Sequence, residues 1–369
     1  MKIAMFGHKD ILSRNGGVEI VVKELSTRFA ALGHDVVVFD RAVKDKVYPY
    51  FYKNVKVDAS PNIHAPGISA FTSSVAAMCK SLLVKPDLIH IHAEGSCFAI
   101  PLAKFFKVPV VVTVHGLDWQ RRKWGKVARS VIKLSEAICA KYADEIITLN
   151  KYDQQYFWKT YHRNTILLPN GVTVMSPSFL CEELRNLGLK DSQYFLFLGR
   201  IVPEKNVDKL ITAFESIQTD FKLVIAGGSS DSNNYYQHVL NLAKQDSRIL
   251  TLGFVEGDRI NQLFSNAYIY ILPSEIEGHP LSLLEAASSG CCCLTSDIKQ
   301  LDGILGDSSL VFSLSDSNSL KESLMWALDN PKVVGELGNR ARNYVVNNYN
   351  WDLIAELTLD IYTSVIEDR

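Results

Sequence analysis

Short apolar segments alternate with amphipathic segments along almost the whole chain, and this alternation restricts the fold more than any other feature. In the first half, the apolar segments are rich in Val, Ile and Leu. Runs of this kind are typical of parallel strands that helices cover on both faces. We therefore expect strands at Lys2 to Phe6, Val36 to Phe39, Leu88 to His92, Val108 to Val114 and Glu145 to Leu149.

The segment from Val18 to Ala31 shows the helical part of this pattern. Val18, Val21, Leu25 and Phe29 recur at helical spacing, and Gly33 follows as a stop signal. The first half is therefore predicted to be an α/β, doubly wound domain.

A turn-rich connector from Leu168 to Pro177, with an Asn-Gly pair and two prolines, divides the chain. A second alternation follows. Its expected strands are Tyr194 to Leu198, Lys222 to Ala226, Ile249 to Leu252, Tyr268 to Leu272 and Cys292 to Thr295, and its expected helices are Val207 to Ser216, Tyr236 to Gln245 and Leu281 to Ser288.

Because 369 residues exceed what one core usually holds, we expect two Rossmann-like domains, at 1–170 and 171–350, facing each other across a cleft. Open α/β sheets bind ligands beyond the carboxyl ends of their strands. The chemistry is therefore expected in that cleft.

Composition excludes several classes of protein. With 39 basic and 40 acidic residues, the chain lacks the charge of a general nucleic-acid binder. The apolar start is too short for a signal peptide, and no run approaches the ~18 apolar residues of a spanning helix, so we expect a cytoplasmic protein. Seven cysteines, with Cys291, Cys292 and Cys293 adjacent, lack disulfide or metal-ligand spacing and should fill a buried strand.

The segment from Pro273 to Gly290 carries the most specific functional pattern. It places Glu277 on a glycine-containing loop and Glu285 on a helix expected from about 280 to 288. The free N–H groups of a helix start can hold a phosphate, while carboxylates accept hydrogen bonds from sugar and ribose hydroxyls. This predicts a nucleotide-sugar site, whereas the glutamate spacing alone would also fit a solvated helix face. The candidate donor contacts are Glu277, Gly278, Pro280, Leu281 and Glu285.

Two cations follow the first strand of the second half. Arg200 and Lys205 could neutralise a diphosphate, Arg by a bidentate grip and Lys as a point charge. A surface salt bridge with Glu204 is the competing interpretation.

Two features of the first half also point toward the expected cleft. Gly16 and Gly17 precede a helix, where glycine lets the backbone approach a ligand; a plain structural turn is the alternative. The loop lacks the G-x-G-x-x-G spacing of a dinucleotide fold. His115 ends a strand, with Asp118 close by, and is a candidate catalytic residue, although a lone strand-end histidine is often only a packed one.

The segment from Trp119 to Lys133 contains six basic residues, two tryptophans and no acid. Such a composition suits contact with an anionic membrane surface. A solvated helix face whose tryptophans pack inward is an equal alternative.

Taken in order, Gly16, Gly17, His115, Arg200, Lys205, Glu277 and Glu285 resemble the pattern of the retaining glycosyltransferases of family four, the group-one sugar transferases with the GT-B fold. The resemblance covers essentially the full length. The opening Gly-Gly-Val-Glu is similar to members that act in capsule, exopolysaccharide and cell-wall glycan synthesis. Many relatives have small or β-branched residues where this chain has Cys291 to Cys293, a departure expected to alter packing only.

The resemblance implies a role for each matching residue. Arg200 and Lys205 would bind the donor diphosphate, Glu285 the ribose and Glu277 the transferred sugar. Gly17 would approach the phosphates, His115 would lie against the donor sugar, and Phe254 with its neighbours would offer backbone contacts to the base. The catalytic set is thus His115, Arg200, Lys205 and Glu277, and the final helix, 351–369, would cross back onto the first domain.

The expected reaction breaks the bond between the anomeric carbon and the diphosphate. The sequence contains no Asp-x-Asp, so we expect no metal and no other cofactor, with cations and helix N-termini stabilising the leaving group instead. Retention is implied by the resemblance alone, and the acceptor it implies is a lipid-linked saccharide.

Two other classes of function use the same residues. A GT-B nucleotide-sugar epimerase would change the sugar without an acceptor. A catalytically silent sugar-nucleotide-binding subunit would neither transfer nor hydrolyse the donor.

Overall fold

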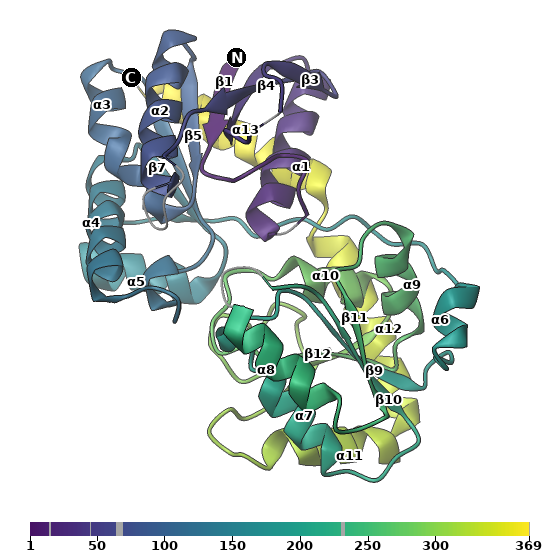
Figure 1. Ribbon diagram of the computed structural model, residues 1–369. Helices are drawn as coiled ribbons and strands as arrows, with labels where there is room; N and C mark the ends of the chain where they lie inside the picture. Colours follow the sequence, from purple (N-terminus) through teal and green to yellow (C-terminus); the bar gives the residue numbers. More distant parts are fainter. Residues whose placement is uncertain (15, 45, 64–68, 230–232, 369) are drawn as a thin grey trace. The chain divides into compact units, whose positions relative to one another are not determined.

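The computed structural model describes residues 1–14, 16–44, 46–63, 69–229 and 233–368. The chain divides into two compact units (Figure 1). The N-terminal unit contains Met1–Gly171 together with Trp351–Arg369, and the C-terminal unit contains Val172–Asn350.

An eight-stranded sheet forms the centre of the N-terminal unit, in the order β3-β4-β2-β1-β5-β6-β7-β8. All neighbouring strands are parallel except β3 and β4, which form an antiparallel hairpin at one edge. The strands are β1 (Lys2–Phe6), β2 (Asp35–Arg41), β3 (Tyr50–Tyr52), β4 (Val55–Ser60), β5 (Leu88–His92), β6 (Val110–Val114), β7 (Glu145–Thr148) and β8 (Ile166–Leu167).

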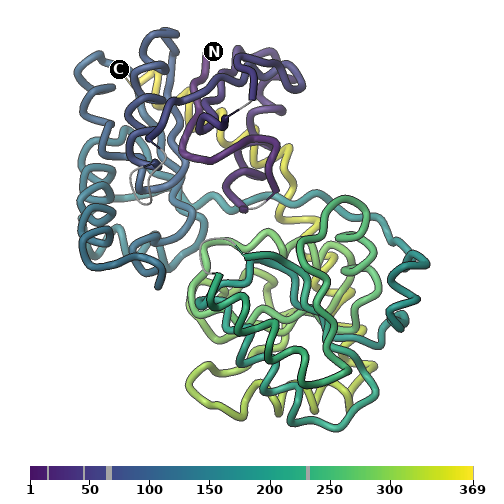
Figure 2. The backbone as a smooth tube through the Cα atoms, in the orientation of Figure 1, coloured from purple at the N-terminus to yellow at the C-terminus, as the bar shows by residue number. Residues whose placement is uncertain are grey.

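The helices of this unit come from both ends of the chain. They are α1 (Gly17–Ala31), α2 (Ser69–Leu83), α3 (Ile100–Phe105), α4 (Lys126–Tyr142), α5 (Lys151–Tyr161) and α13 (Trp351–Glu367), with short 3-10 turns at Glu94–Ala99 and Asp118–Gln120. Figure 2 shows the yellow C-terminal segment beside the purple helix α1. Arg28 of α1 donates to Asp352 of α13 over 2.7 Å, and Phe29 packs edge-on against Tyr362.

The C-terminal unit contains a fully parallel six-stranded sheet, in the order β11-β10-β9-β12-β13-β14. Its strands are β9 (Tyr194–Leu198), β10 (Lys222–Ala226), β11 (Ile249–Gly253), β12 (Ile269–Leu272), β13 (Cys292–Ser296) and β14 (Leu310–Phe312). Its helices are α6 (Glu182–Asn186), α7 (Val207–Glu215), α8 (Asn233–Ala243), α9 (Asp258–Asn266), α10 (Leu281–Ser288), α11 (Ser319–Asp329) and α12 (Pro331–Asn348), with a 3-10 turn at Pro203–Lys205.

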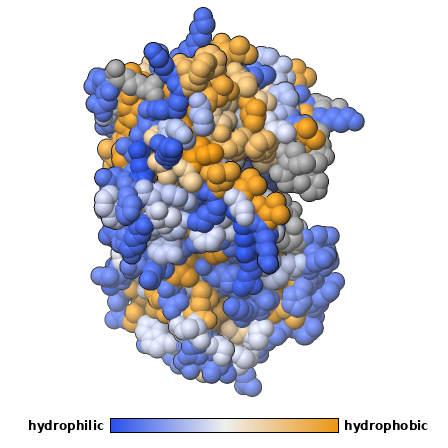
Figure 3. Space-filling view, turned by 90° about the vertical axis from the view of Figure 1, so that its left-hand side faces the viewer, coloured by the Kyte–Doolittle hydropathy of each residue, from blue (hydrophilic) through white to orange (hydrophobic). Residues whose placement is uncertain are grey.

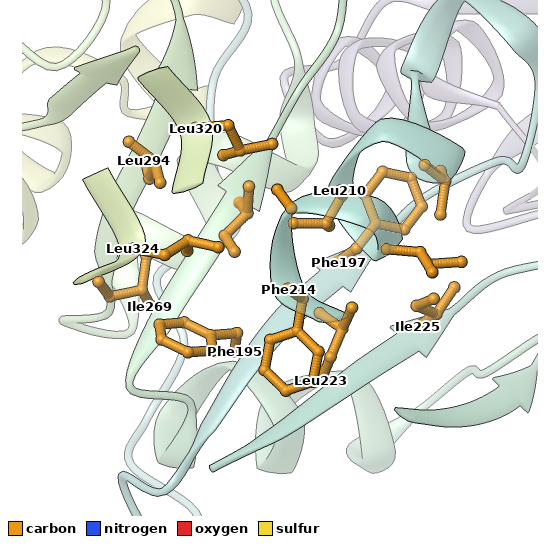
Figure 4. Close-up of a cluster of buried hydrophobic side chains, with 14 of the residues drawn as sticks. Phe195, Phe197, Leu210, Phe214, Leu223, Ile225, Ile269, Leu294, Leu320 and Leu324 are labelled. Carbon is orange, nitrogen blue, oxygen red and sulfur yellow. The ribbon is translucent and has the colours of Figure 1, made fainter. Parts of the chain in front are cut away.

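The hydrophobic core of the C-terminal unit lies between strands and helices that are distant in sequence. In Figure 4, side chains of β9, β10, β12 and β13 meet those of α7 and α11. Phe195, Phe197 and Phe214 are fully buried there. Burying such side chains contributes about 1.5–3 kcal/mol each, which fixes the sheet that carries the loops described below.

Both sheets have a topological switch point, where the strand order reverses direction. In the N-terminal unit it lies between β1 and β5, and in the C-terminal unit between β9 and β12. The loops that leave two such strands diverge to opposite faces of the sheet and open a crevice at the carboxyl edge, which is where doubly wound folds bind ligands.

Most expected elements are present with small shifts at their ends. Strand β6 begins at Val110 and not at Val108, because Pro109 cannot donate to the ladder. Pro280, expected in the first turn of its helix, is the residue before α10, with extended backbone (ψ 115°). The hairpin of β3 and β4 was not expected, since its short edge strands are partly exposed and lack a continuous apolar run.

The buried cysteines agree with the expectation. Cys291, Cys292 and Cys293 are at most 4% exposed, and the last two begin β13. Burial raises the pKa of each of these thiols above its ordinary value. They are packed small hydrophobes and are held in the unreactive thiol form.

Two glycines of helix α12 provide a matched test of this packing. A Cβ on Gly338 would lie 2.2 Å from the carbonyl oxygen of Gly290, whereas a Cβ on Gly335 would meet nothing within 4 Å. We expect Gly338→Ala to lower the free energy of unfolding by about 1–3 kcal/mol through overpacking. Gly335→Ala should raise it by about 0.5–1 kcal/mol because alanine is the better helix former. Urea unfolding of both variants checks this, and equal effects would contradict the close approach.

Candidate functional site

The predicted donor residues of the C-terminal unit cluster at the carboxyl edge of its sheet. Arg200 and Lys205 follow β9, Phe254 follows β11, and Glu277 follows β12. Because β9 and β12 are neighbours at the switch point, Lys205 and Glu277 are brought together although they are 72 positions apart. The sheet topology thus assembles this part of the site.

Three contacts clasp the loop after β9 to the loop after β12. Lys205 Nζ forms an ion pair with Glu277 Oε1, and the two side chains are only 14% and 9% exposed. Asn206 Nδ2 donates to the carbonyl oxygen of Pro273 over 3.0 Å, and the N–H of Glu275 donates to the carbonyl oxygen of Glu204 over 2.9 Å. We call these three contacts the loop clasp.

The loop clasp corrects one interpretation of the sequence. Lys205 pairs with Glu277 and not with its neighbour Glu204, which is buried. Asn206 has left-handed backbone (φ 48°, ψ 39°), a conformation that asparagine tolerates better than most residues. This turn ends the 3-10 segment and starts α7, so it directs Lys205 toward the loop after β12.

A buried tyrosine, Tyr270, also connects β9, β12 and α10. Tyr270 of β12 donates to Ser282 Oγ of α10 over 2.8 Å and lies 3.3 Å from the carbonyl oxygen of Leu198 at the end of β9. Burial raises the pKa of Tyr270, and the charges of Glu277 and Glu285 act in the same direction. Tyr270 thus links the end of β9 to helix α10, which carries Glu285.

Glycines let the backbone approach closely at this edge. Gly227, after β10, has φ +148°, and a Cβ there would lie 1.8 Å from the carbonyl oxygen of Gly199. Phe254, after β11, is 52% exposed, and its Cβ lies 3.7 Å from where Gly228 would carry one. An exposed aromatic side chain beside a glycine, which has no side chain, is suited to contact with a flat ring such as a base.

Helix α10 begins immediately after the predicted phosphate-binding loop. Pro280 and Leu281 are buried, while Gly278 and Glu285 are partly buried. His279, between them, packs edge-on against Tyr349, and burial lowers its pKa to about 3. A neutral histidine at this position adds no charge to the site.

The predicted glycines of the N-terminal unit stand at the start of α1. Gly16 is the residue before the helix, with extended backbone, and Gly17 is the first helical residue. A Cβ on Gly16 would lie 2.4 Å from Glu19 Oε2, and Glu19 Oε1 accepts from the N–H of Lys9 over 3.1 Å. This carboxylate closes the loop onto the helix start.

His115 belongs to a group of histidines at the carboxyl ends of β5 and β6. His115 Nε2 lies 3.0 Å from His92 Nδ1, and the rings of His90 and His92 are 4.0 Å apart. His90 Nε2 bonds to Thr113 Oγ1 over 2.8 Å, and its Nδ1 bonds to the hydroxyl of Tyr362 from α13. Burial lowers the pKa of His115 to about 4, so the ring is neutral near pH 7.

The buried residue Glu94 bonds to the loop that follows His115, which we call the His115 loop. Glu94 Oε2 accepts from the N–H of Asp118 over 3.2 Å, and the backbone oxygen of Glu94 accepts from Ser135 Oγ over 2.6 Å. Burial, followed by the charges of Glu136 and Asp118, raises the pKa of Glu94 well above its ordinary value. Glu94 therefore ties the loop to helix α4.

The tryptophans of the basic segment pack inward. Lys133 Nζ lies 4.0 Å from the centre of the Trp119 ring, and Lys123 lies 4.6 Å from that of Trp124. The exposed apolar residues of α4 are instead Val127, Val131 and Leu134, which share one face at helical spacing. The segment is thus basic and amphipathic, but its exposed apolar face is aliphatic.

Over the ranges that the structure describes, no group of three or more His, Cys, Asp or Glu side chains could hold a metal ion. No helix within those ranges is long and apolar enough to cross a membrane.

Within the C-terminal unit, the structure brings Lys205 and Glu277 into contact, and Glu285 lies on α10, which bonds to Tyr270 through Ser282. Gly16, Gly17 and His115 belong to the other unit, so the cleft between the two domains stays a prediction. Sequence analysis missed Asn206, Tyr270 and His92. Asn206 carried a usable signal, an asparagine directly before a helix, whereas Tyr270 and His92 stand in apolar strand segments that give no hint of a polar role.

Comparison with known proteins agrees with this architecture. A family model for "Glycosyltransferase Family 4" matches residues 15–174, and one for "Glycosyl transferases group 1" matches residues 182–344. The UDP-Gal:alpha-D-GlcNAc-diphosphoundecaprenol alpha-1,3-galactosyltransferase of Escherichia coli is 28% identical over 311 residues, 77% of each chain.

Solved structures show the same fold. Sucrose-phosphate synthase from Thermosynechococcus elongatus superposes with a TM-score of 0.85 at 21% identity, covering all of both chains. HepE from Anabaena, solved with UDP-glucose, has a TM-score of 0.82 at 14% identity, covering 99% of this chain and 100% of the other. The chain therefore belongs to the group 1 glycosyltransferases of family four, has the GT-B fold and is a glycosyltransferase.

The ion pair of the loop clasp can be tested independently of activity. Removing one partner of a largely buried pair leaves the other charge unpaired, so Lys205→Met and Glu277→Gln should each lower the free energy of unfolding by about 2–4 kcal/mol. The double variant should lose less than the sum, with a coupling of at least about 1 kcal/mol.

The matched control is the exposed pair of Arg259 and Glu183, whose side chains are 50% and 63% exposed. Arg259→Met should cost less than about 0.5 kcal/mol. Additive effects of Lys205→Met and Glu277→Gln in urea unfolding would show that the two side chains do not interact.

Proposed function

We propose that the protein transfers a sugar from a nucleotide-diphosphate sugar to a lipid-linked saccharide, with retention of anomeric configuration, in the synthesis of a cell-surface polysaccharide or glycan. The observation that carries the donor part is the loop clasp at the switch point of the C-terminal sheet. The acceptor part is supported by the E. coli relative, whose name specifies a saccharide on diphosphoundecaprenol.

In this proposal the loop clasp holds the residues that bind the diphosphate. Lys205 is paired with Glu277, and both follow strands that end at the carboxyl edge of the sheet. An incoming diphosphate offers Lys205 a more highly charged partner, which frees the carboxylate of Glu277 to accept hydrogen bonds from the hydroxyls of the sugar. Arg200 would grip the same diphosphate, and Glu285 on α10 would accept from the ribose.

Stabilising the departing diphosphate is the main catalytic task. As the bond to the anomeric carbon breaks, negative charge grows on the leaving phosphate, and fixed cations lower the barrier because they are in place before the reaction. We assign this task to Arg200 and Lys205, with no metal or other cofactor.

Helix α4 supplies a surface suited to a membrane-bound acceptor. Val127 is 80% exposed, Val131 48% and Leu134 62%, and the basic residues Lys126 and Arg129 lie on the same helix. Figure 3 faces the side of the N-terminal unit that carries α3 and α4, and orange apolar side chains there lie among blue hydrophilic ones. We propose that this face lies on an anionic bilayer, where the apolar side chains enter the interface and the cations meet lipid phosphates.

Vesicle binding tests the membrane proposal. Replacing Val127 and Leu134 together with Ser should reduce binding to phosphatidylglycerol vesicles by about tenfold or more, because each buried CH₂ group contributes about 0.8 kcal/mol. Val311→Ser, which changes a 58%-exposed valine of β14, should leave binding unchanged. Equal sedimentation of the wild type with phosphatidylcholine and phosphatidylglycerol vesicles, or retained binding of the double variant, would contradict the proposal.

The diphosphate assignment predicts the effect of removing either cation. Arg200→Ala and Lys205→Ala should each lower turnover of the nucleotide-sugar donor by about a hundredfold or more, the scale seen when one charge-stabilising group is lost. The exposed Lys209→Ala on α7 is the matched control and should retain full turnover. Donor consumption, followed with and without a lipid-linked acceptor, gives the rate, and near wild-type turnover in the Arg200 or Lys205 variants would refute the assignment.

A further inference from the structure

His92 and His115 share one hydrogen bond at the crevice of the N-terminal sheet. His92 is the last residue of β5, beside the switch point, and its backbone pairs with Thr113 of β6, two residues before His115. The two bonded atoms, His92 Nδ1 and His115 Nε2, are 3.0 Å apart, and the ring centres are 5.3 Å apart. One of these nitrogens must carry the shared proton and the other must accept it.

Both rings are neutral. Burial, followed by the charges of His90, His115 and His8, lowers the pKa of His92 well below its ordinary value. Burial lowers the pKa of His115 to about 4, with Asp118 opposing and Arg121 adding to the shift. A neutral imidazole carries one proton on one of its two ring nitrogens. The direction of the shared hydrogen bond therefore determines which nitrogen of each ring carries that proton.

Proton accounting selects one of the two arrangements. His92 is fully buried, and its Nε2 has no hydrogen-bond partner among the residues that the structure describes. If His115 donated, the proton of His92 would sit on that Nε2 as a buried, unpaired N–H. If His92 donates, Nε2 carries only an unused lone pair, which is the less costly state because orphaned buried N–H groups are rarer than unused acceptors.

We propose that His92 is a positioning residue, whose Nδ1–H donates to His115 Nε2 and thereby holds His115 in the tautomer that carries its proton on Nδ1. His115 then offers an N–H donor to a hydroxyl of the donor sugar, a step that rests on the proposed function. Because its Nε2 lone pair is already used by His92, the His115 ring does not accept a proton during transfer.

The backbone around His92 is built to hold this bond. Ala93 has φ +92°, an uncommon conformation for a residue with a side chain, of the kind found where a site is held against strain. A Cβ on Gly7 would lie 1.8 Å from the carbonyl oxygen of His92, so the backbone after β1 lies in close contact with His92. Glu94, two positions after His92, ties the His115 loop through the N–H of Asp118.

Nitrogen NMR of the wild-type protein tests the tautomer without any need for activity. Histidine labelled with ¹⁵N gives different patterns of ring nitrogen shifts and couplings for the two tautomers, and the His115 signals are identified by their loss in His115→Gln. We expect a protonated Nδ1 and an unprotonated Nε2 on His115, and the reverse pattern would overturn the inference.

Two replacements of His92 test its positioning role. His92→Asn keeps an amide N–H close to the position of Nδ1 and should retain the His115 tautomer and most of the donor turnover. His92→Leu has similar bulk and no donor, so His115 should return to the Nε2–H form and turnover should fall by about tenfold or more, because one hydrogen bond to the donor sugar is lost. Equal turnover in His92→Leu and the wild type would exclude the role, as would an equal loss in His92→Asn and His92→Leu.

The two readouts separate the possible failures. If the wild type consumes no nucleotide sugar, the proposed function fails while the tautomer result still stands or falls by NMR. If donor turnover is present and His115 carries its proton on Nε2, the function survives and the role of His92 is wrong.

Discussion

The site of the C-terminal unit depends on the contact between the loop after β9 and the loop after β12. Parallel pairing places the ends of these two strands side by side, and the reversal of strand order there sends the following chain in opposite directions. The ion pair of Lys205 with Glu277 and two hydrogen bonds hold the loops together where they would otherwise diverge. A largely buried ion pair contributes little net stability, because its attraction is offset by desolvation. It keeps two opposite charges side by side at the carboxyl edge of the sheet.

The N-terminal unit also carries polar groups beside its switch point, but these groups are of a different chemical kind. Its switch point lies between β1 and β5, and Gly7 and His92 stand at the ends of these strands. Here the polar groups are neutral histidines and a buried glutamate whose pKa is raised, since burial disfavours their charged forms. One unit thus offers fixed charges suited to a diphosphate, and the other offers neutral hydrogen-bonding groups suited to hydroxyls.

Much of this architecture was accessible from the sequence, and the reasons are local. Strands such as β1 and β9 are continuous apolar runs between helical patterns, so their bounds were expected correctly. The edge hairpin of β3 and β4 was not, because its pairing gives a pattern of partial exposure with no long apolar run. The places of Arg200, Lys205 and Glu277 in the fold were accessible because these charged residues stand in the segments that follow buried strands, while their roles stay predictions. The pairing of Lys205 with Glu277, the link through Tyr270 and the bond between His92 and His115 depend on contacts across the sheet, which no local pattern encodes.

The central proposal is that a bound diphosphate replaces Glu277 as the ion-pair partner of Lys205. A crystal structure of the protein with a nucleoside diphosphate, soaked as the uridine, guanosine and thymidine forms in turn, tests it most directly. The account predicts phosphate oxygens within hydrogen-bonding distance of Arg200 and Lys205, with the carboxylate of Glu277 turned away from Lys205. A bound diphosphate that contacts neither cation, or that leaves the ion pair of Lys205 and Glu277 intact, would contradict it.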